Sequence, residues 1–384
     1  MSVVERLRVL RVRSPLVRPF VTAVRRTDLL DVVLVEATDA DGRVGWGEAA
    51  TSWRVTGESA PSVAAAVAGP LGDTVLGREA GDPSLAADIA ASVWGNAAAR
   101  SGVECAVADL AARERGLSVL SSFSGADAVH DSSGTPHIRT DMTLSVAEPR
   151  SLAALSAEYV TAGFGCLKIK ASAAQDTVAG LRAVRAAVGP AITLRIDANQ
   201  AWDAETAIRV IRAAEDEGLG IELVEQPVAA HDIDALAAVA AAVDTPIMAD
   251  ESVRTARDVR MIADRRAAAL VNLKLAKTGG LAEALVAAET ARSAGLGVVI
   301  GCMMESHVGV TAAAHLAAAV APDVVHDLDA AFWLRRSPVI GGIRSEADVL
   351  DLALGSRGFG IDALAADADA DVLADVRIRA GVRA

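Results

Sequence analysis

The chain has 384 residues, with 37 Lys and Arg against 50 Asp and Glu, so its formal net charge is −13 and its pI is near 5.0. Such an acidic chain offers no basic field to attract phosphates, which argues against a nucleic-acid-binding function. Hydrophobic residues make up 52% of the sequence and charged residues 23%, a balance that argues against intrinsic disorder. No run reaches the roughly 18 consecutive apolar residues of a membrane-spanning helix.

The N-terminal residues and the cysteines indicate the cellular compartment in which the protein works. Its first 20 residues carry an arginine every few positions and have no apolar signal core. The three cysteines, Cys105, Cys166 and Cys302, are scattered and do not make a disulfide framework. We therefore expect a cytoplasmic protein without a membrane partner, long enough for two domains or for a barrel with additions.

The first part of the sequence predicts an α+β domain. Three strands are predicted there, at 8–13, 31–37 and 43–49. From residue 64 to about 125 the pattern becomes helical, and one amphipathic helix runs over 98–115 and ends at Gly116. Strands followed by helices indicate an α+β domain, to which we assign residues 1–130. The polar segment 126–136 is typical of a linker.

From about residue 137, short apolar runs alternate with longer Ala-rich helical patterns. The runs are centred near residues 140, 167, 195, 223, 248, 271, 300 and 326. This regular spacing predicts parallel strands joined by crossover helices. A doubly wound sheet would use about six such units, whereas eight fit a closed barrel better. We assign the barrel to residues 131–336 and expect the tail, 337–384, to pack back on the first domain.

Basic residues are distributed unevenly. Only four of the 37 are lysines, which leaves 33 arginines (37 − 4), and the lysines fall in two short windows: Lys168, Lys170, Lys274 and Lys277. A coding bias explains why lysines are few but not why they cluster. Arginine is effectively always protonated, whereas lysine can lose its proton in a suitable site. The pattern favours sites where an amine must titrate.

Ionisable residues end nearly every predicted barrel strand, where the active sites of such barrels lie. Asp197, Glu225 and Asp250 end consecutive strands, which lie about 4.8 Å apart in a sheet. Three carboxylates so close would repel unless a cation lay between them, and an all-oxygen set suits Mg²⁺. The alternative is a salt-bridge network with nearby arginines.

The lysines flank these carboxylates. Lys168 and Lys170 leave the same face of one strand, and Lys274 leaves a strand across the barrel. Neighbouring ammonium groups and a metal ion should lower the lysine pKa toward the range useful to a general base. A base on each side of a pocket suits inversion at a carbon. The alternative is that the lysines only neutralise the carboxylates, and we interpret Lys277 as structural.

Asp327 and Asp329 share one face of the last strand and add negative charge near the three carboxylates. This arrangement requires a cationic partner, and a substrate ammonium is the simplest candidate. Alternatively, the two aspartates cap nearby arginines, such as Arg335 or Arg336.

Together these motifs resemble the enolase superfamily, and specifically its muconate-lactonizing branch. The resemblance covers almost the whole chain and includes Arg18-Pro19-Phe20 and Gly45-Trp46-Gly47-Glu48-Ala49 near the N-terminus. Asp327-Leu328-Asp329 is similar to the signature of the dipeptide epimerases of the Ala-Glu epimerase type. The other matching motifs are Lys168-Ile169-Lys170, Asp197-Ala198-Asn199, Glu225-Gln226-Pro227, Ala249-Asp250-Glu251-Ser252 and Asn272-Leu273-Lys274.

The resemblance implies an α/β fold: a modified (β/α)₇β barrel with an α+β capping domain formed by the N-terminal region and the C-terminal tail. It implies a Mg²⁺-dependent isomerase that inverts the α-carbon of the C-terminal residue of a dipeptide. The reaction would be a 1,1-proton transfer by Lys170 and Lys274 through a metal-stabilised enediolate, with Lys168 holding the carboxylate. We expect a homo-oligomer with a small-molecule substrate.

By similarity, Thr143 and Cys302 would line the substrate site, and Arg25 would bind a side-chain carboxylate. Trp53 and Arg54 depart from the small and aliphatic residues expected in the second specificity loop, so the preferred dipeptide stays open. Other reactions of the branch remain alternatives: N-acylamino acid racemisation, o-succinylbenzoate synthesis and cycloisomerisation. A non-catalytic barrel that binds a metal and an acid is a third possibility.

Overall fold

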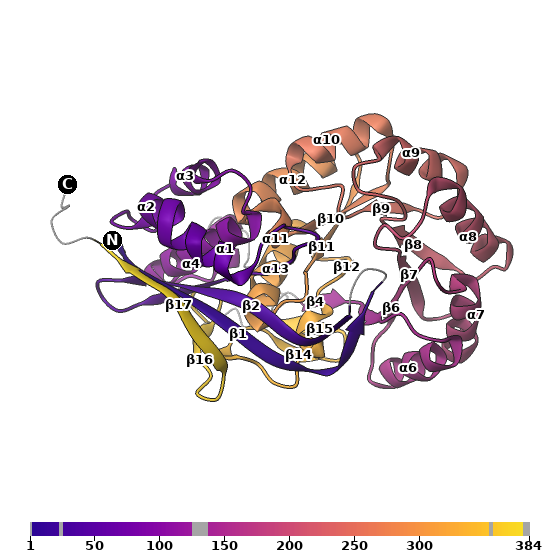
Figure 1. Cartoon of the computed structure of the whole chain (residues 1–384), viewed down its shortest axis with the longest axis horizontal. Helices are drawn as coiled ribbons and strands as arrows, with labels where there is room; N and C mark the ends of the chain where they lie inside the picture. Colours follow the sequence, from indigo (N-terminus) through magenta and orange to yellow (C-terminus); the bar gives the residue numbers. More distant parts are fainter. Residues whose placement is uncertain (1, 23–25, 125–136, 353–355, 379–384) are drawn as a thin grey trace.

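The computed structural model describes residues 2–22, 26–124, 137–352 and 356–378. The predicted α/β class is confirmed: a capping domain lies against one side of a β/α barrel (Figure 1). Among the described residues, no helix is long and apolar enough to span a bilayer. The linker predicted at 126–136 lies outside the described residues.

The capping domain is built on an antiparallel sheet in the order β17-β1-β2-β3. The C-terminal strand β17 therefore completes a sheet that the N-terminus begins. Its strands are β1 (Val4–Val21), β2 (Arg26–Asp39), β3 (Val44–Ala49) and β17 (Asp369–Arg377). Its helices are α1 (Ala60–Ala66), the π-helix η1 (Val67–Leu71), α2 (Gly72–Val75), α3 (Leu85–Ser92), α4 (Ala97–Arg115) and α5 (Val119–Ser124).

Strand β1 is longer than the predicted 8–13. Register shifts, one of them between Pro15 and Phe20, let β1 keep pairing with β2 past the proline. In Figure 1 this β1–β2 ribbon extends from the capping domain toward the barrel mouth. The extension brings Phe20 to the site described below.

Helix α4 ends at Gly116, as predicted, because this glycine adopts the left-handed conformation (φ +70°) that commonly terminates helices. The helix lies directly on β3, and two glycines make the contact possible. A Cβ atom at Gly47 would lie 1.9 Å from the carbonyl oxygen of Gly102, and one at Gly45 would lie 2.1 Å from that of Ala106. The Gly45-Trp46-Gly47 motif therefore serves close helix–strand packing.

The barrel contains all eight predicted runs. Seven strands form a parallel sheet in the order β11-β10-β9-β8-β7-β6-β5. The ring closes because β12 pairs with β4, and a bridge between Gly301 and Asp327 joins it to β11. The strands are β4 (His137–Thr140), β5 (Met142–Leu144), β6 (Cys166–Lys170), β7 (Thr193–Asp197), β8 (Ile221–Glu225), β9 (Ile247–Ala249), β10 (Leu270–Lys274), β11 (Gly297–Gly301) and β12 (Val325–His326).

Helices follow the strands, and most of them cover the outside of the barrel (Figure 1). They are α6 (Pro149–Thr161), α7 (Thr177–Val188), α8 (Ala204–Asp216), α9 (Ile233–Ala242), α10 (Ala256–Arg265), α11 (Leu275–Thr278), α12 (Leu281–Ser293) and α13 (His307–Val320). The remaining elements of the tail region are the 3₁₀ helix η2 (Asp329–Trp333), β13 (Val339–Gly341), β14 (Arg344–Glu346), β15 (Val349–Asp351) and β16 (Ile361–Leu364).

A buried carboxylate ties the capping domain to the barrel. Glu48 of β3 accepts hydrogen bonds from the backbone N–H groups of Ser306 and Gly309 at the N-terminus of α13. This is a favourable place for a negative charge, because the first N–H groups of a helix lack partners within the helix. The contact fixes the capping domain beside the segment that follows β11.

Candidate active site

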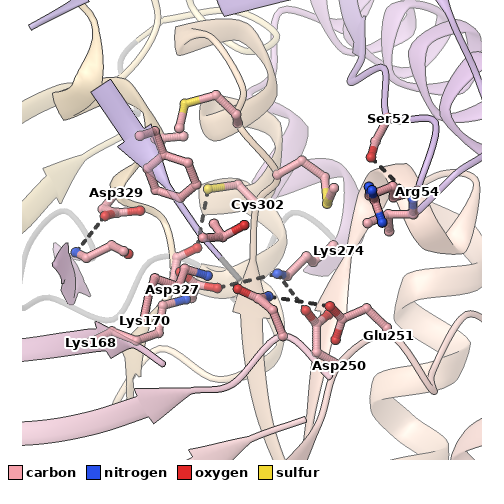
Figure 2. Close-up of a pocket in the computed structure, with 18 of the residues that line it drawn as sticks. Ser52, Arg54, Lys168, Lys170, Asp250, Glu251, Lys274, Cys302, Asp327 and Asp329 are labelled. Carbon is pink, nitrogen blue, oxygen red and sulfur yellow. Dashed lines mark hydrogen bonds and ion pairs between the residues drawn. The ribbon is translucent and has the colours of Figure 1, made fainter. Parts of the chain in front are cut away.

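A cavity of about 310 Å³ lies between the capping domain and the C-terminal ends of the barrel strands. The capping domain contributes Phe20, Thr22 and the loop 51–55. Figure 2 shows Lys168 and Lys170 on one side of the site and Lys274 and Asp250 on the other. The barrel contributes Thr143, Lys168, Lys170, Asn199, Asp250, Glu251, Lys274, Cys302, Met303, Met304, Asp327, Asp329 and Ala330.

Barrel register brings the predicted lysines and carboxylates together. Lys170 pairs in register with Asp197 of the next strand, and Asp197 with Glu225. Each carboxylate faces a lysine amine: the Lys170 Nζ–Asp197 Oδ2 distance is 2.5 Å, Lys168 Nζ–Glu225 Oε2 is 3.4 Å, and Lys274 Nζ–Asp250 Oδ2 is 2.9 Å. In the described part of the chain, no three acidic, His or Cys side chains converge on one point as metal ligands do. The carboxylates turn toward amines instead.

The chemistry of these carboxylates nevertheless fits Mg²⁺. Asp197, Glu225 and Asp250 supply only oxygen donors from three adjacent strand ends, and all three side chains are buried. Burial raises the pKa of Glu225 well above its ordinary value, and the charge of Asp197 raises it further. Two such neighbouring carboxylates require positive charge between them, and a divalent cation satisfies this requirement.

The pKa values of two lysines shift in the direction opposite to our expectation. Burial lowers the pKa of Lys168 and Lys274, but the surrounding carboxylates outweigh burial and raise both well above the ordinary value. Repulsion from Lys168 also lowers the pKa of Lys274, but this effect is smaller than the increase caused by Asp250 and Asp327. As the chain stands, both amines are held in the charged form.

The two aspartates of the last strand have different surroundings. Asp327 already has a cationic partner, because its Oδ1 lies 2.5 Å from Lys168 Nζ. Asp329 has no ion pair with any described residue. Its Oδ2 accepts hydrogen bonds from Thr143 N at 2.8 Å and Trp333 Nε1 at 3.1 Å. Asp329 therefore offers an uncompensated negative charge to the cavity, and neither Arg335 nor Arg336 caps it.

The remaining residues predicted to bind substrate differ in their position relative to the cavity. Thr143 and Cys302 line the cavity. The N–H and Sγ of Cys302 both donate to the carbonyl oxygen of Asp327, at 3.0 and 3.3 Å, so its N–H is already engaged. Arg25 lies outside the described residues. Trp53 and Arg54 stand at the rim, with Trp53 76% exposed.

Several site residues sit in the recognised motifs but had no predicted role. Asn272 Nδ2 donates to Glu225 Oε1 at 2.7 Å and to Asp327 Oδ2 at 3.1 Å, which links two strand ends. Glu251 lines the cavity, and burial raises its pKa to about 7. Asn199 donates to Asp197 Oδ2 and adopts φ +43°, a strained conformation for a non-glycine residue.

Gln226 joins two neighbouring strand ends. Its Oε1 accepts from the backbone N–H groups of Asp250 (2.9 Å) and Ser252 (3.2 Å), and its Nε2 donates to Ser252 Oγ and Val228 O. The residue adopts φ +35°. The fixed position of Asp250 depends on this amide, and strand spacing alone gives no signal for it.

Comparisons with known proteins cover most of the chain. Residues 5–122 match the family model for the mandelate racemase/muconate lactonizing enzyme N-terminal domain. Residues 151–365 match the model described as enolase C-terminal domain-like.

The names of similar proteins indicate different dipeptide substrates. The chain is 38% identical over 360 residues to the L-Ala-D/L-Glu epimerase of Bacillus subtilis, covering 93% of this chain and 96% of that protein. It is 33% identical to the L-Lys-D/L-Arg epimerase of Methylococcus capsulatus, covering 85% and 90%. Among solved structures, a dipeptide epimerase from Enterococcus faecalis V583 complexed with Mg and L-Leu-L-Tyr matches with a TM-score of 0.87 and 34% identity, covering 94% of this chain and all of that one.

Proposed function

Since this chain belongs to the mandelate racemase/muconate lactonizing enzyme family of the enolase superfamily, we propose that it is a Mg²⁺-dependent dipeptide epimerase. It would invert the α-carbon of the C-terminal residue of its substrate. One observation carries the proposal: lysines from opposite sides of the barrel face a single cavity that also contains Asp329, an aspartate without a cationic partner among the described residues.

Asp197, Glu225 and Asp250 would hold the metal ion. When bound, Mg²⁺ would supply positive charge that stabilises the negative charge developing on the substrate carboxylate. Asn272 would keep Glu225 in place through its 2.7 Å hydrogen bond. Gln226 would do the same for the backbone of Asp250.

Lys170 and Lys274 would transfer the protons. Lys170 leaves β6 beside Asp197 and Lys274 leaves β10 beside Asp250, so the two amines reach the cavity from opposite sides (Figure 2). One lysine would take the α-proton to give the enediolate of the substrate, and the other would return a proton to the opposite face. Lys168, held by Asp327 and Glu225, would stay protonated and donate to the substrate carboxylate.

Asp329 would bind the α-ammonium of the dipeptide. Its Oδ2 is held by Thr143 and Trp333, which fixes the carboxylate without neutralising it. Asp327 would act indirectly, through its contact with Lys168. N-acylated substrates lack this ammonium, so the site favours a dipeptide over the other reactions of the branch.

The proposal is tested by incubating the purified chain with a dipeptide panel in D₂O. The C-terminal residues of the panel should include acidic, basic, apolar and aromatic side chains, since the rim carries both Trp53 and Arg54. We expect deuterium at the α-carbon of the C-terminal residue from either epimer, and only with Mg²⁺ present. N-acetylated forms of the same dipeptides are the matched control and should exchange poorly. A full panel without exchange in the presence of Mg²⁺ would refute the proposal.

A further inference from the structure

Lys277 is among the most deeply buried cations of the described chain, with an exposed fraction of 2%. It lies in the short helix α11, which follows β10 directly. Its Nζ atom donates to three acceptors: the carbonyl oxygen of Asp250, Asp250 Oδ1 at 2.5 Å, and the carbonyl oxygen of Asn272 at 3.0 Å. An ammonium group has three N–H donors, so these contacts use all of them.

Asp250 is therefore shared between two lysines. Its Oδ1 faces Lys277, and its Oδ2 lies 2.9 Å from Lys274. The two lysines differ in access: Lys274 lines the cavity, whereas Lys277 does not. The Lys274 amine can leave Asp250 and contact a substrate in the cavity. Lys277 cannot, because two backbone carbonyl groups, those of Asp250 and Asn272, hold its amine in place.

We propose that Lys277 is a positioning residue of the metal site and serves as the counter-charge of Asp250. It holds Oδ1 and leaves Oδ2 toward the cavity for a divalent cation, so that Lys274 is free to act on the substrate. The inference rests on the proposed function in one respect, the role of Asp250 as a metal ligand. It gives a site role to the one lysine whose position in the sequence indicated none.

Geometry favours lysine over arginine here. The three acceptors lie around one nitrogen, which suits the compact ammonium head and not the planar fork of a guanidinium. The alternative is a purely structural cation that fastens α11 to two strand ends. That role would affect the stability of the fold but not the affinity of the folded protein for a metal ion.

The experiment measures Mg²⁺ binding by titration calorimetry and the thermal midpoint of the full chain without added metal. Lys277→Met removes the charge at similar length, and Lys277→Gln removes the charge but keeps an N–H donor. The matched control is Arg113→Met, because Arg113 is a largely buried cation of the capping domain that pairs with Asp109 and donates to the carbonyl oxygen of Ile361.

We expect both Lys277 variants to raise the Kd for Mg²⁺ at least about tenfold, as is typical when the partner of a metal ligand is lost. Arg113→Met should lower the thermal midpoint without changing that Kd. If Lys277→Met does not fold, Lys277→Gln decides the question. A Kd within about twofold of wild type in a folded Lys277 variant overturns the inference, as does a wild-type chain that binds no Mg²⁺. Wild type that binds Mg²⁺ but exchanges no dipeptide would contradict the epimerase function alone.

Discussion

The capping sheet and the barrel mouth both pair cations with carboxylates, but at different depths below the surface. On the capping sheet, Arg6 and Arg11 of β1 pair with Asp375 and Asp31, and their side chains are 30% and 37% exposed. At the barrel mouth, Lys168 and Lys274 pair with carboxylates, and their side chains are only 2% and 7% exposed.

The same kind of ion pair therefore has different consequences. Hydrogen bonds to their aspartates raise the pKa of Arg6 and Arg11, which were protonated in any case. Exposed pairs of this type contribute little stability, because water competes for both partners. At the barrel mouth, burial makes each charge depend on its neighbours, so that adding or removing one charge changes the protonation of the others. The exposed pairs of the capping sheet are made by arginines, whereas lysines make the buried pairs at the barrel mouth.

Loss of a cavity-facing lysine should have the largest effect. Lys274→Ala is expected to reduce epimerisation by about 10³-fold or more, because it removes one partner of the proton transfer. Lys277 remains to neutralise Asp250, so the variant should fold and bind Mg²⁺. Steady-state rates and calorimetry check both statements. Arg182→Ala, which breaks an exposed pair with Glu217 on the outside of the barrel, is the control and should retain the wild-type rate.

Loss of the uncompensated aspartate should have a smaller effect on rate. Asp329→Asn keeps the side-chain shape but removes the charge that would meet the substrate ammonium. We expect kcat/KM for dipeptides to fall by about 10 to 100-fold, as for a lost hydrogen bond to a charged group. The small activity on N-acetylated dipeptides should not change. An unaltered kcat/KM on dipeptides would favour one of the other reactions of the branch.

His315 is a buried titratable side chain that forms no ion pair with any described residue. Its Nδ1 accepts from Leu120 N at 3.1 Å, and burial lowers its pKa to about 3. In the unfolded chain the pKa is about 6.5, so below pH 6.5 the unfolded state binds a proton that the folded state does not. Folding stability should therefore fall with pH in this window, by up to about 1.4 kcal/mol for each pH unit.

The variant His315→Asn keeps an acceptor for Leu120 but cannot titrate. Urea unfolding of wild type and variant at pH 7 and pH 4.5 isolates the contribution of this one residue. The gap between the two unfolding free energies should shrink as pH falls. A gap that is independent of pH would show that His315 does not titrate differently in the folded and unfolded chains.

The exposed pairs should give the smallest effect. Arg6→Gln breaks the contact with Asp375 across β1 and β17. We expect a loss of less than about 1 kcal/mol in the unfolding free energy, and less still at high salt. Chemical denaturation at low and high ionic strength measures it. A loss of several kcal/mol would mean that the capping sheet depends on its surface charges as strongly as the barrel mouth depends on its buried ones.

Much of the site could be predicted from the sequence because barrel topology brings strand ends together. The positions of Lys170, Asp197 and Glu225 follow from spacing, since consecutive parallel strands place their last residues in register. Likewise Gly116 marked the end of α4. Such predictions need only the spacing of the apolar runs along the sequence and the rule that active sites lie at the C-terminal ends of barrel strands.

Other features depend on side-chain direction and turn geometry, which spacing does not carry. We expected Asp327 to need a cationic partner such as a substrate ammonium, but Lys168 of β6, on the other side of the β4–β5 run from β12, already pairs with it. Lys277, interpreted as structural because it precedes Thr278-Gly279-Gly280, lies in α11, and its amine contacts Asp250. The link between Gln226 and Asp250 arises from a left-handed backbone that the sequence does not signal.

In the proposed reaction, two lysines serve opposite faces of one α-carbon. The most direct measurement is α-proton exchange in D₂O, followed by NMR, for each pure epimer with Lys170→Ala and with Lys274→Ala. We predict that each variant exchanges only the epimer whose α-proton faces the remaining lysine, and that the two variants prefer opposite epimers. If both variants fold, bind Mg²⁺ and favour the same epimer, or if either still interconverts the two at the wild-type rate, the two lysines do not serve opposite faces of the α-carbon.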